Sequence, residues 1–260
     1  MKTSFFKQGF LAIGIACCMQ LSAVENPVDY VNTLVGTQSK YELSTGNTYP
    51  ATAMPWGMNF WTPQTGEMGN GWTYRYDADK IRGFKQTHQP SPWMNDYGQF
   101  SIMPTTEGLV FDEEKRASWF SHKGEVATPY YYKVNLDRYN IQTEITPTHH
   151  SVFYRFTYPK SGNKNILLDM KHNIPQQIVP IVKGQFLGGN ISYDESSGLL
   201  TGWGEYLGGF GSAEPYKVFF AIRPDVKLKE VKVTDKGVKA LYARLSLPTD
   251  AETVHLGVGV

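Results

Sequence analysis

From Tyr130 to the end of the chain, short segments with alternating apolar and polar residues follow one another every ~8–12 residues. Alternation at period two places one set of side chains on one face of a strand, so each segment predicts a half-buried β-strand. The predicted strands are 130–136, 141–148, 151–158, 165–170, 185–187, 191–193, 199–203, 216–222, 226–233, 241–247 and 254–258. We find no long stretch of helical period, so the sequence predicts an all-β protein with a large antiparallel β-sandwich.

Upstream of these strands, residues 46–104 form a segment rich in Gly, Pro and aromatic residues. Four of the six Trp residues lie in it: Trp56, Trp61, Trp72 and Trp93. Gly and Pro interrupt long helices and strands, so we expect ordered loops between short strands. Aromatic loops on a rigid scaffold usually present a binding surface.

Composition supports the fold class and limits the partners. The 260 residues include 25 Gly and 15 Pro, and aromatic residues make up 14% of the chain, which suits a β protein with many turns. The formal net charge is +1, so charge gives no argument for binding nucleic acid or an acidic membrane surface.

Residues 1–23 predict an export signal. Lys2 and Lys7 give a basic start, an apolar core follows at 10–19, and Ala23 supplies a small residue for cleavage. The apolar core is too short for a transmembrane helix. We therefore expect export to the periplasm, the outer membrane or the medium.

Both cysteines of the chain, Cys17 and Cys18, fall within this signal. Each matches half of a bacterial lipoprotein signal, which favours a plain export signal and leaves a lipid anchor open. The exported chain would contain no disulfide, so its core alone must hold the fold.

The last residue, Val260, follows directly on a predicted apolar strand. A natural terminus seldom leaves such a strand uncovered, so we expect the sequence to be part of a longer protein.

Short motifs follow one another in a fixed order along the first part of the chain. They are VNTLVGT at 31–37, GNTYP at 46–50, PWGM at 55–58, IRGF at 81–84, TH at 87–88, DYG at 96–98, MP at 103–104, EVATPYY at 125–131 and EITPT at 144–148. In this order and spacing they resemble the N-terminal domain of glycoside hydrolase family 92, a family of exported bacterial α-mannosidases. The resemblance covers about residues 27–260, and it departs from the family at 85–93, where many members read Ser-His-Thr-His followed by Gly-rich residues.

This resemblance implies an enzyme of two domains. Residues 27–260 would form a sandwich of the galactose-mutarotase-like, or supersandwich, type. An α/α barrel beyond Val260 would carry the catalytic acid, the catalytic base and a calcium ion. Members use an inverting mechanism, in which the two carboxyl groups lie ~6.5–9.5 Å apart. The resemblance thus implies an exo-α-mannosidase for glycoprotein N-glycans or yeast mannan, and a chain that is inactive without the barrel.

Four residues of the aromatic segment are candidates for sugar contacts: Trp72, His88, Trp93 and Asp96. Aromatic rings stack on the C–H faces of sugars, and charged or amide groups bond their hydroxyls. We expect these residues to form one wall of a mannose pocket at the interface with the barrel.

Structural interpretations of these residues stand beside the functional one. Trp72 and Trp93 could equally lie in the core, His88 could be a hydrogen-bonded structural histidine, and Asp96 could shape a turn. For Trp56 a place in the core is the favoured interpretation.

Metal ligands are not expected in this chain. The adjacent His149 and His150 would face opposite sides of a strand, and Asp77 with Asp79 lacks the rest of a calcium loop. Two other classes of function remain open: a free-standing carbohydrate-binding sandwich and a structural or adhesive sandwich without ligand.

Overall fold

The computed structural model describes residues 26–38, 48–66, 74–87, 98–171, 185–207 and 214–260. The chain divides into two units between Val31 and Asn32. In the first unit the described residues form a short 3-10 helix, η1 (Pro27–Tyr30). All strands belong to the second unit.

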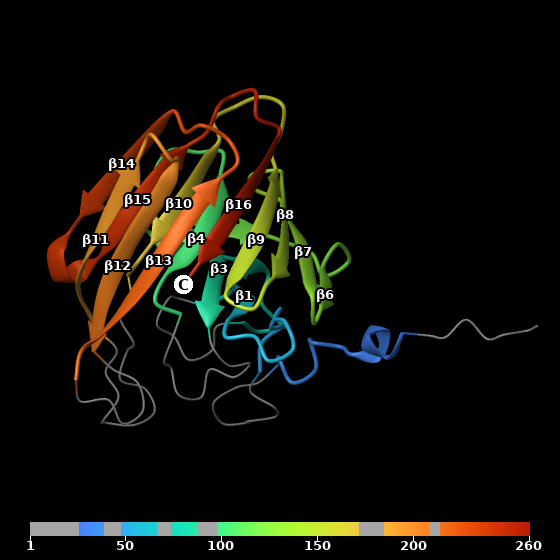
Figure 1. Ribbon diagram of the computed structural model, residues 1–260. Coiled ribbons are helices and arrows are strands. Elements are labelled where there is room, and N and C mark those ends of the chain that lie inside the picture. Colours follow the sequence, from blue (N-terminus) through green and yellow to red (C-terminus); the bar gives the residue numbers. More distant parts are fainter. Residues whose placement is uncertain (1–25, 39–47, 67–73, 88–97, 172–184, 208–213) are drawn as a thin grey trace, which may run out of the picture. The chain divides into compact units, whose positions relative to one another are not determined.

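Two antiparallel sheets make up the second unit (Figure 1). The six-stranded sheet has the order β1 (Phe60–Gln64), β3 (Gly83–Thr87), β4 (Ser101–Thr105), β10 (Asn165–Asp169), β15 (Leu241–Ser246) and β14 (Glu230–Asp235). The eight-stranded sheet has the order β11 (Gln185–Asp194), β12 (Leu199–Leu207), β13 (Tyr216–Pro224), β16 (Thr253–Gly259), β9 (Ser151–Thr157), β8 (Ile141–Pro147), β7 (Tyr131–Leu136) and β6 (Val126–Thr128). The predicted all-β antiparallel sandwich is confirmed.

Small elements complete this unit. They are a two-stranded sheet of β2 (Lys80–Ile81) and β5 (Ser118–Trp119), the single-turn helix α2 (Glu113–Arg116) and the 3-10 turn η2 (Gly237–Lys239). The part of the chain that the structure describes contains no helix long and apolar enough to cross a membrane.

The core lies between the two sheets, as the alternation of the strands requires. In β9, Val152, Tyr154 and Phe156 are buried while Phe153 faces outward. The ring of Trp61 from β1 meets the edge of Tyr154 from the other sheet at a centroid distance of 5.8 Å. Aromatic contacts of this kind bury large apolar areas, which stabilise the fold by about 25 cal/mol per Å².

The predicted strands agree with the structure, with local differences. The two short strands expected at 185–187 and 191–193 are one strand, β11, because a bulge between Phe186 and Gly188 lets the pairing continue past the glycines. The strand expected at 226–233 begins later, as β14. Lys232 is exposed on β14, an edge strand of the six-stranded sheet.

The favoured interpretation of Trp56 is wrong. Its side chain is 98% exposed rather than part of the core. Trp56 has a φ of 60° in a tight turn that Gly57 closes by donating its N–H to the carbonyl of Met54 at 2.9 Å. This left-handed turn directs the indole away from the sheets.

Candidate functional site

Several strand ends gather along one border of each sheet. In the six-stranded sheet, β3 ends at Thr87, and Ser101 at the start of β4 pairs with Asp169 at the end of β10. In the eight-stranded sheet, Gln185 at the start of β11 pairs with Leu207 at the end of β12. Neighbouring antiparallel strands run in opposite directions, so the end of one strand lies beside the start of the next. The chain therefore leaves or enters the sheet at this one border at all of these strand ends.

Gln99 joins the two sheets at this border. Its side-chain Nε2 donates to the hydroxyl of Tyr216 at 2.8 Å, and its carbonyl accepts from the hydroxyl of Tyr206 at 3.1 Å. Burial raises the pKa of Tyr206 well above its ordinary value, so this hydroxyl stays protonated as the donor. Gln99 thereby fixes the segment that leads into β4 against β12 and β13.

A second group of buried polar side chains lies at the same border as Gln99. Gln86 Nε2 donates to Asn59 Oδ1 at 3.0 Å, and Asn59 Nδ2 donates to the carbonyl of His150 at 2.8 Å. The hydroxyls of Tyr49 and Thr87 are 2.5 Å apart. We call Tyr49, Asn59, Gln86, Thr87 and Gln99 the strand-end cluster; all five residues are buried. These hydrogen bonds hold the side chains of the cluster in place, although the Oε1 atoms of Gln86 and Gln99 are buried without a hydrogen-bond partner among the described residues.

A buried layer of charges backs this border on the outer face of the six-stranded sheet. Lys85 pairs with Ser101, which pairs with Asp169, so the three residues form one cross-strand row. Arg116 covers the row, with Nη1 2.7 Å from Asp169 Oδ2 and Nη2 3.4 Å from Glu113 Oε1. Two cations and two carboxylates thus lie together out of water.

Burial shifts the pKa values within this layer. Desolvation lowers the pKa of Lys85 to about 8, and the nearby carboxylates of Glu113 and Asp169 oppose this shift. Desolvation also raises the pKa of Asp169, although Arg116 acts in the opposite direction. Gly98, at φ +103°, lies directly against Lys85, because a Cβ at Gly98 would come within 2.6 Å of Lys85 Cε.

Glu125 is a third anchor, at the end of the segment 67–73. Its carboxylate accepts from the hydroxyl of Tyr74 at 3.0 Å, from that of Tyr132 at 2.6 Å, and from His122 Nδ1 at 2.5 Å. The other ring nitrogen of His122 is 2.7 Å from the carbonyl of Tyr76, whose ring stacks on the imidazole at 4.1 Å. Both ring nitrogens therefore face oxygen atoms, which fixes the orientation of the imidazole.

All four predicted sugar-binding residues lie outside the described residues. Trp72 belongs to the segment 67–73, while His88, Trp93 and Asp96 belong to the segment 88–97. Their contacts with a sugar therefore stay predictions. The structure describes the residues on either side of both segments: Glu125 holds Tyr74, Lys85 lies against Gly98, and Thr87 belongs to the strand-end cluster.

Sequence reasoning missed the anchors Lys85, Gln99 and Glu125. Lys85 and Gln99 lie in or beside short strands and belong to none of the motifs, whereas Glu125 begins the motif at 125–131, which carries no sign of its buried contacts. The one available signal was the uninterrupted polar run at 85–87 inside a strand, where an exposed face would require alternation.

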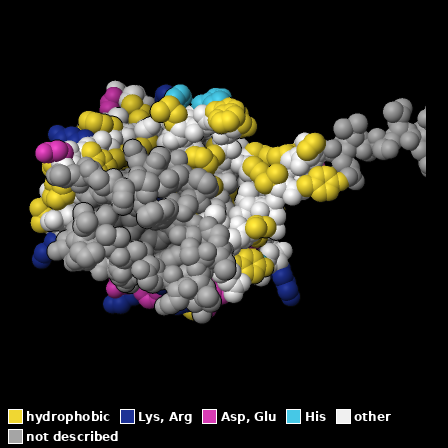
Figure 2. All heavy atoms as spheres, turned by 90° about the horizontal axis from the view of Figure 1, so that it is seen from below, with side chains coloured by type: hydrophobic (Ala, Val, Ile, Leu, Met, Phe, Trp, Pro, Cys, Tyr) yellow, Lys and Arg dark blue, Asp and Glu magenta, His cyan; other side chains and the backbone are white. Residues whose placement is uncertain are grey.

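The described residues offer no metal centre: none of their His, Cys, Asp and Glu side chains form a group of three or more that could hold a metal ion. These described residues therefore do not fit a calcium ion. On the face shown in Figure 2, the charged side chains of the described residues are scattered around the rim and form no block of one sign.

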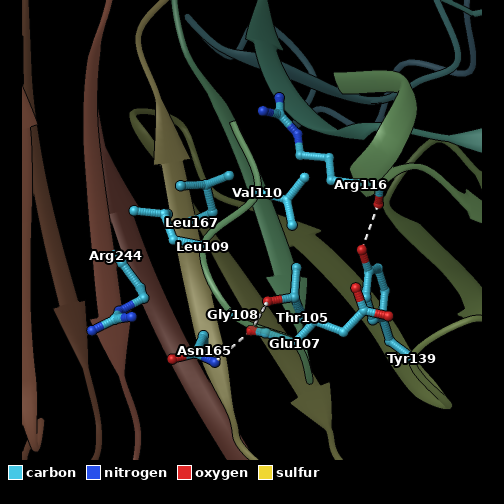
Figure 3. A pocket seen from close by; sticks show the side chains of 10 residues that line it. All are labelled: Thr105, Glu107, Gly108, Leu109, Val110, Arg116, Tyr139, Asn165, Leu167 and Arg244. Carbon is cyan, nitrogen blue, oxygen red and sulfur yellow. Dashed lines mark hydrogen bonds between the residues drawn. The ribbon is translucent and has the colours of Figure 1, made fainter. Parts of the chain in front are cut away.

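A small cavity lies under the loop that follows β4 (Figure 3). Its volume is about 10 Å³, room for roughly one water molecule. Asn165 Nδ2 donates to the carbonyl of Glu107 at 3.0 Å, and the hydroxyl of Tyr139 donates to the carbonyl of Arg116 at 2.7 Å. These bonds hold the loop on the sheet, and the cavity is too small for a sugar.

Comparison with known proteins gives one family. Residues 30–260 match the model of the glycosyl hydrolase family 92 N-terminal domain. An inverting mannosidase of family GH92 from Bacteroides thetaiotaomicron VPI-5482 is 34% identical, with a TM-score of 0.76 over 89% of this chain and 31% of that chain. A GH92 α-mannosidase from Bacteroides thetaiotaomicron is 26% identical, with a TM-score of 0.73 over 89% of this chain and 33% of that one.

The second relative has also been solved in complex with mannoimidazole, and that structure superimposes with a TM-score of 0.71. The chain spans about a third of the length of these solved relatives. No curated protein matches it.

Proposed function

The chain belongs to the glycosyl hydrolase family 92 N-terminal domain family, and we propose that it is the domain of a calcium-dependent, inverting exo-α-mannosidase that contributes one wall of the substrate pocket. The observation that carries the proposal is the strand-end border, where buried hydrogen bonds hold Tyr74 beside the segment 67–73, and Thr87 and Gln99 beside the segment 88–97. A sugar pocket requires aromatic and polar residues on a rigid scaffold, and this border is such a scaffold.

In this proposal the chain binds and orients the sugar and does not itself carry out the chemistry. Trp72 and Trp93 stack on the C–H face of a mannose ring, and His88 and Asp96 bond its hydroxyls. The catalytic acid, the catalytic base and the calcium ion belong to an α/α barrel outside this chain, so the chain alone is inactive. Excluding water from the face opposite the base would assist an inverting attack by a single water molecule.

The substrate class follows from the relatives. One is an inverting mannosidase, and another is an α-mannosidase solved in complex with mannoimidazole. We therefore assign mannose-containing glycans, from glycoprotein N-glycans or yeast mannan. The departure at residues 85–93 begins in the buried strand β3 and continues into the segment proposed to face the sugar, so the linkage preference does not follow from the family.

The proposal includes export from the cytoplasm. Residues 1–23 act as a signal peptide, with lipid attachment at Cys17 or Cys18 as the alternative. An exported glycosidase meets polymeric glycans outside the cell, which suits a protein without disulfides and with a large core.

Kinetics of the longer protein test the pocket wall. Replacing Trp72 or Trp93 with Ala should raise KM for α-mannobiose or lower kcat/KM by about tenfold or more, since stacking on an aromatic ring contributes ~1–3 kcal/mol. Trp119→Ala is the control, because its half-exposed indole lies on β5. Unchanged kinetics in both loop variants would contradict the proposal.

The alternative function is a non-catalytic carbohydrate-binding module. A protein of this kind would bind mannan as this chain alone with full affinity and would have no hydrolytic partner domain. The length of the solved relatives favours the enzyme.

A further inference from the structure

A surface groove of about 270 Å³ lies on the outer face of the eight-stranded sheet, over β7, β8, β9 and β16. Its lining includes Tyr131, Glu144, Phe153, Arg155 and His255. The groove is on the face turned away from the core, whereas the strand-end cluster lies at the border of the sheets. It is therefore separate from the site proposed above.

Phe153 is the aromatic wall of this groove. Its ring is 52% exposed, although its neighbours in β9, Val152 and Tyr154, are fully buried. Across the strand pair it faces Gly257 of β16. A Cβ at Gly257 would meet the Phe153 ring at 3.5 Å, an ordinary contact, so close packing does not require the glycine. The absence of a side chain at Gly257 leaves the face of the Phe153 ring open.

Beside the ring lies a fixed pair of polar groups. Glu144 accepts from the hydroxyl of Tyr131 at 2.5 Å and from Arg155 Nε at 2.6 Å. The carboxylate side chain is only 7% exposed, while the guanidinium side chain is 52% exposed. The hydrogen bonds from Arg155 hold the pKa of Glu144 below its ordinary value, so the carboxylate stays charged.

His255 closes the far side of the groove. Its Nδ1 is 2.7 Å from Asp225 Oδ2, and its backbone N–H donates to Asp225 Oδ1 at 2.8 Å. The imidazole is thus oriented before any ligand arrives. One open aromatic face, an oriented guanidinium and an oriented imidazole are the groups that recognise a neutral sugar ring.

We propose that this groove is an accessory binding site for a pyranose ring of a mannose-containing oligosaccharide, with Phe153 stacking on the ring and Arg155 and His255 bonding its hydroxyls. The choice of mannose rests on the proposed function; the choice of a neutral sugar rests on the groove. A protein segment is the less suitable occupant, because charged and hydrogen-bonding side chains surround a single exposed ring. The site would hold a polymeric substrate near the enzyme and would take no part in bond cleavage.

Binding of yeast mannan and α-mannobiose to the recombinant chain, measured by calorimetry, tests this site. Phe153→Ala and Arg155→Gln should each weaken binding at least about fivefold. The free energy of unfolding should change little for Phe153→Ala, whose ring is half exposed, and should fall for Arg155→Gln, which leaves the buried carboxylate of Glu144 without its ion-pair partner. Trp119→Ala is the matched control, with the same 52% exposure on another sheet, and should bind like the wild type. Equal affinity of the two groove variants and the wild type, or no binding of any neutral polysaccharide, would overturn the proposal.

The longer protein separates this inference from the proposed function. Phe153→Ala should keep kcat/KM on an aryl α-mannoside, which reaches only the pocket, and should lose activity on mannan at low concentration. Protection of Phe153 from oxidative footprinting in the sugar-free longer protein would show that another part of the protein covers the groove, and would overturn the accessory site alone. Binding of a different neutral polysaccharide at the groove, without mannosidase activity, would keep the site and reject the proposed function.

Discussion

Lys85 carries a buried ammonium group in β3, the strand that precedes the segment 88–97, which is predicted to face the sugar. Its Nζ lies among Glu113, Asp169 and the backbone of Gly98. A buried lysine with carboxylates nearby can be structural or functional, since both arrangements shift the pKa.

The stability of the fold should therefore depend on pH through Lys85. The pKa of Lys85 is about 8 in the folded chain and ~10.4 in an unfolded one. Between these values the unfolded state binds more protons, so the free energy of unfolding rises with pH in this window. Below pH ~8 both states are protonated and the cost of burying the charge is present in full.

We expect the wild type to gain about 2–3 kcal/mol relative to Lys85→Met between pH ~7.5 and ~10, as followed by urea unfolding. Lys232→Met is the control, since Lys232 is exposed on the edge strand β14. Its free energy of unfolding should change with pH in the same way as that of the wild type. A difference between the wild type and Lys85→Met that does not change with pH would reject this account.

Buried polar residues whose partners come from distant parts of the chain are hard to predict from sequence. Glu125 is recognisable as important only when the chain brings Tyr74 and Tyr132 to it, from positions 51 and 7 residues away. Trp56 shows the opposite error, because hydrophobicity predicted burial and the turn conformation directed the ring outward. The four sugar-binding candidates remain untested for a different reason, since they lie outside the described residues.

At the scale of elements, the pairing of β3 with β4 depends on one glycine. Gly83 begins β3 at φ +157°, and a Cβ there would lie 2.1 Å from Ser101 Oγ. Ser101 is buried in β4 and cannot move without disturbing the charged row that it shares with Lys85 and Asp169.

Gly83→Ala should therefore destabilise the chain by about 2–4 kcal/mol, a range typical of overpacking combined with backbone strain. The midpoint of urea unfolding measures the effect. Gly108→Ala is the matched control, because no atom lies within 4 Å of a Cβ built at that position. If Gly83→Ala unfolded at the same urea concentration as the wild type, the conclusion that the approach of β3 to β4 requires a glycine at position 83 would be wrong.

Elements with strict alternation were predicted most accurately. The expected strands at 141–148, 151–158 and 241–247 match β8, β9 and β15 to within one residue at each end. Period-two patterns survive into the fold because one face of each strand must meet the core. The glycine-rich strand β11 was divided by the prediction, since glycines carry no pattern and a bulge preserves the pairing.

For the whole molecule, the family and the antiparallel sandwich are established, and the role of the chain in mannoside hydrolysis is the central proposal. The chain spans about a third of the solved GH92 mannosidases that it resembles. In this proposal the sandwich supplies loops, and an α/α barrel outside this chain supplies the acid, the base and the calcium ion. Binding and chemistry are thus divided between two proposed domains.

The most direct test is the hydrolysis of an aryl α-mannoside and of α-mannobiose by the longer protein, beside this chain alone, with and without EDTA. The account predicts that the longer protein releases mannose with inversion at the anomeric carbon, that chelation stops the reaction, and that this chain alone is inactive. Mannose release by this chain alone, or the absence of any α-mannosidase activity in the longer protein, would contradict it.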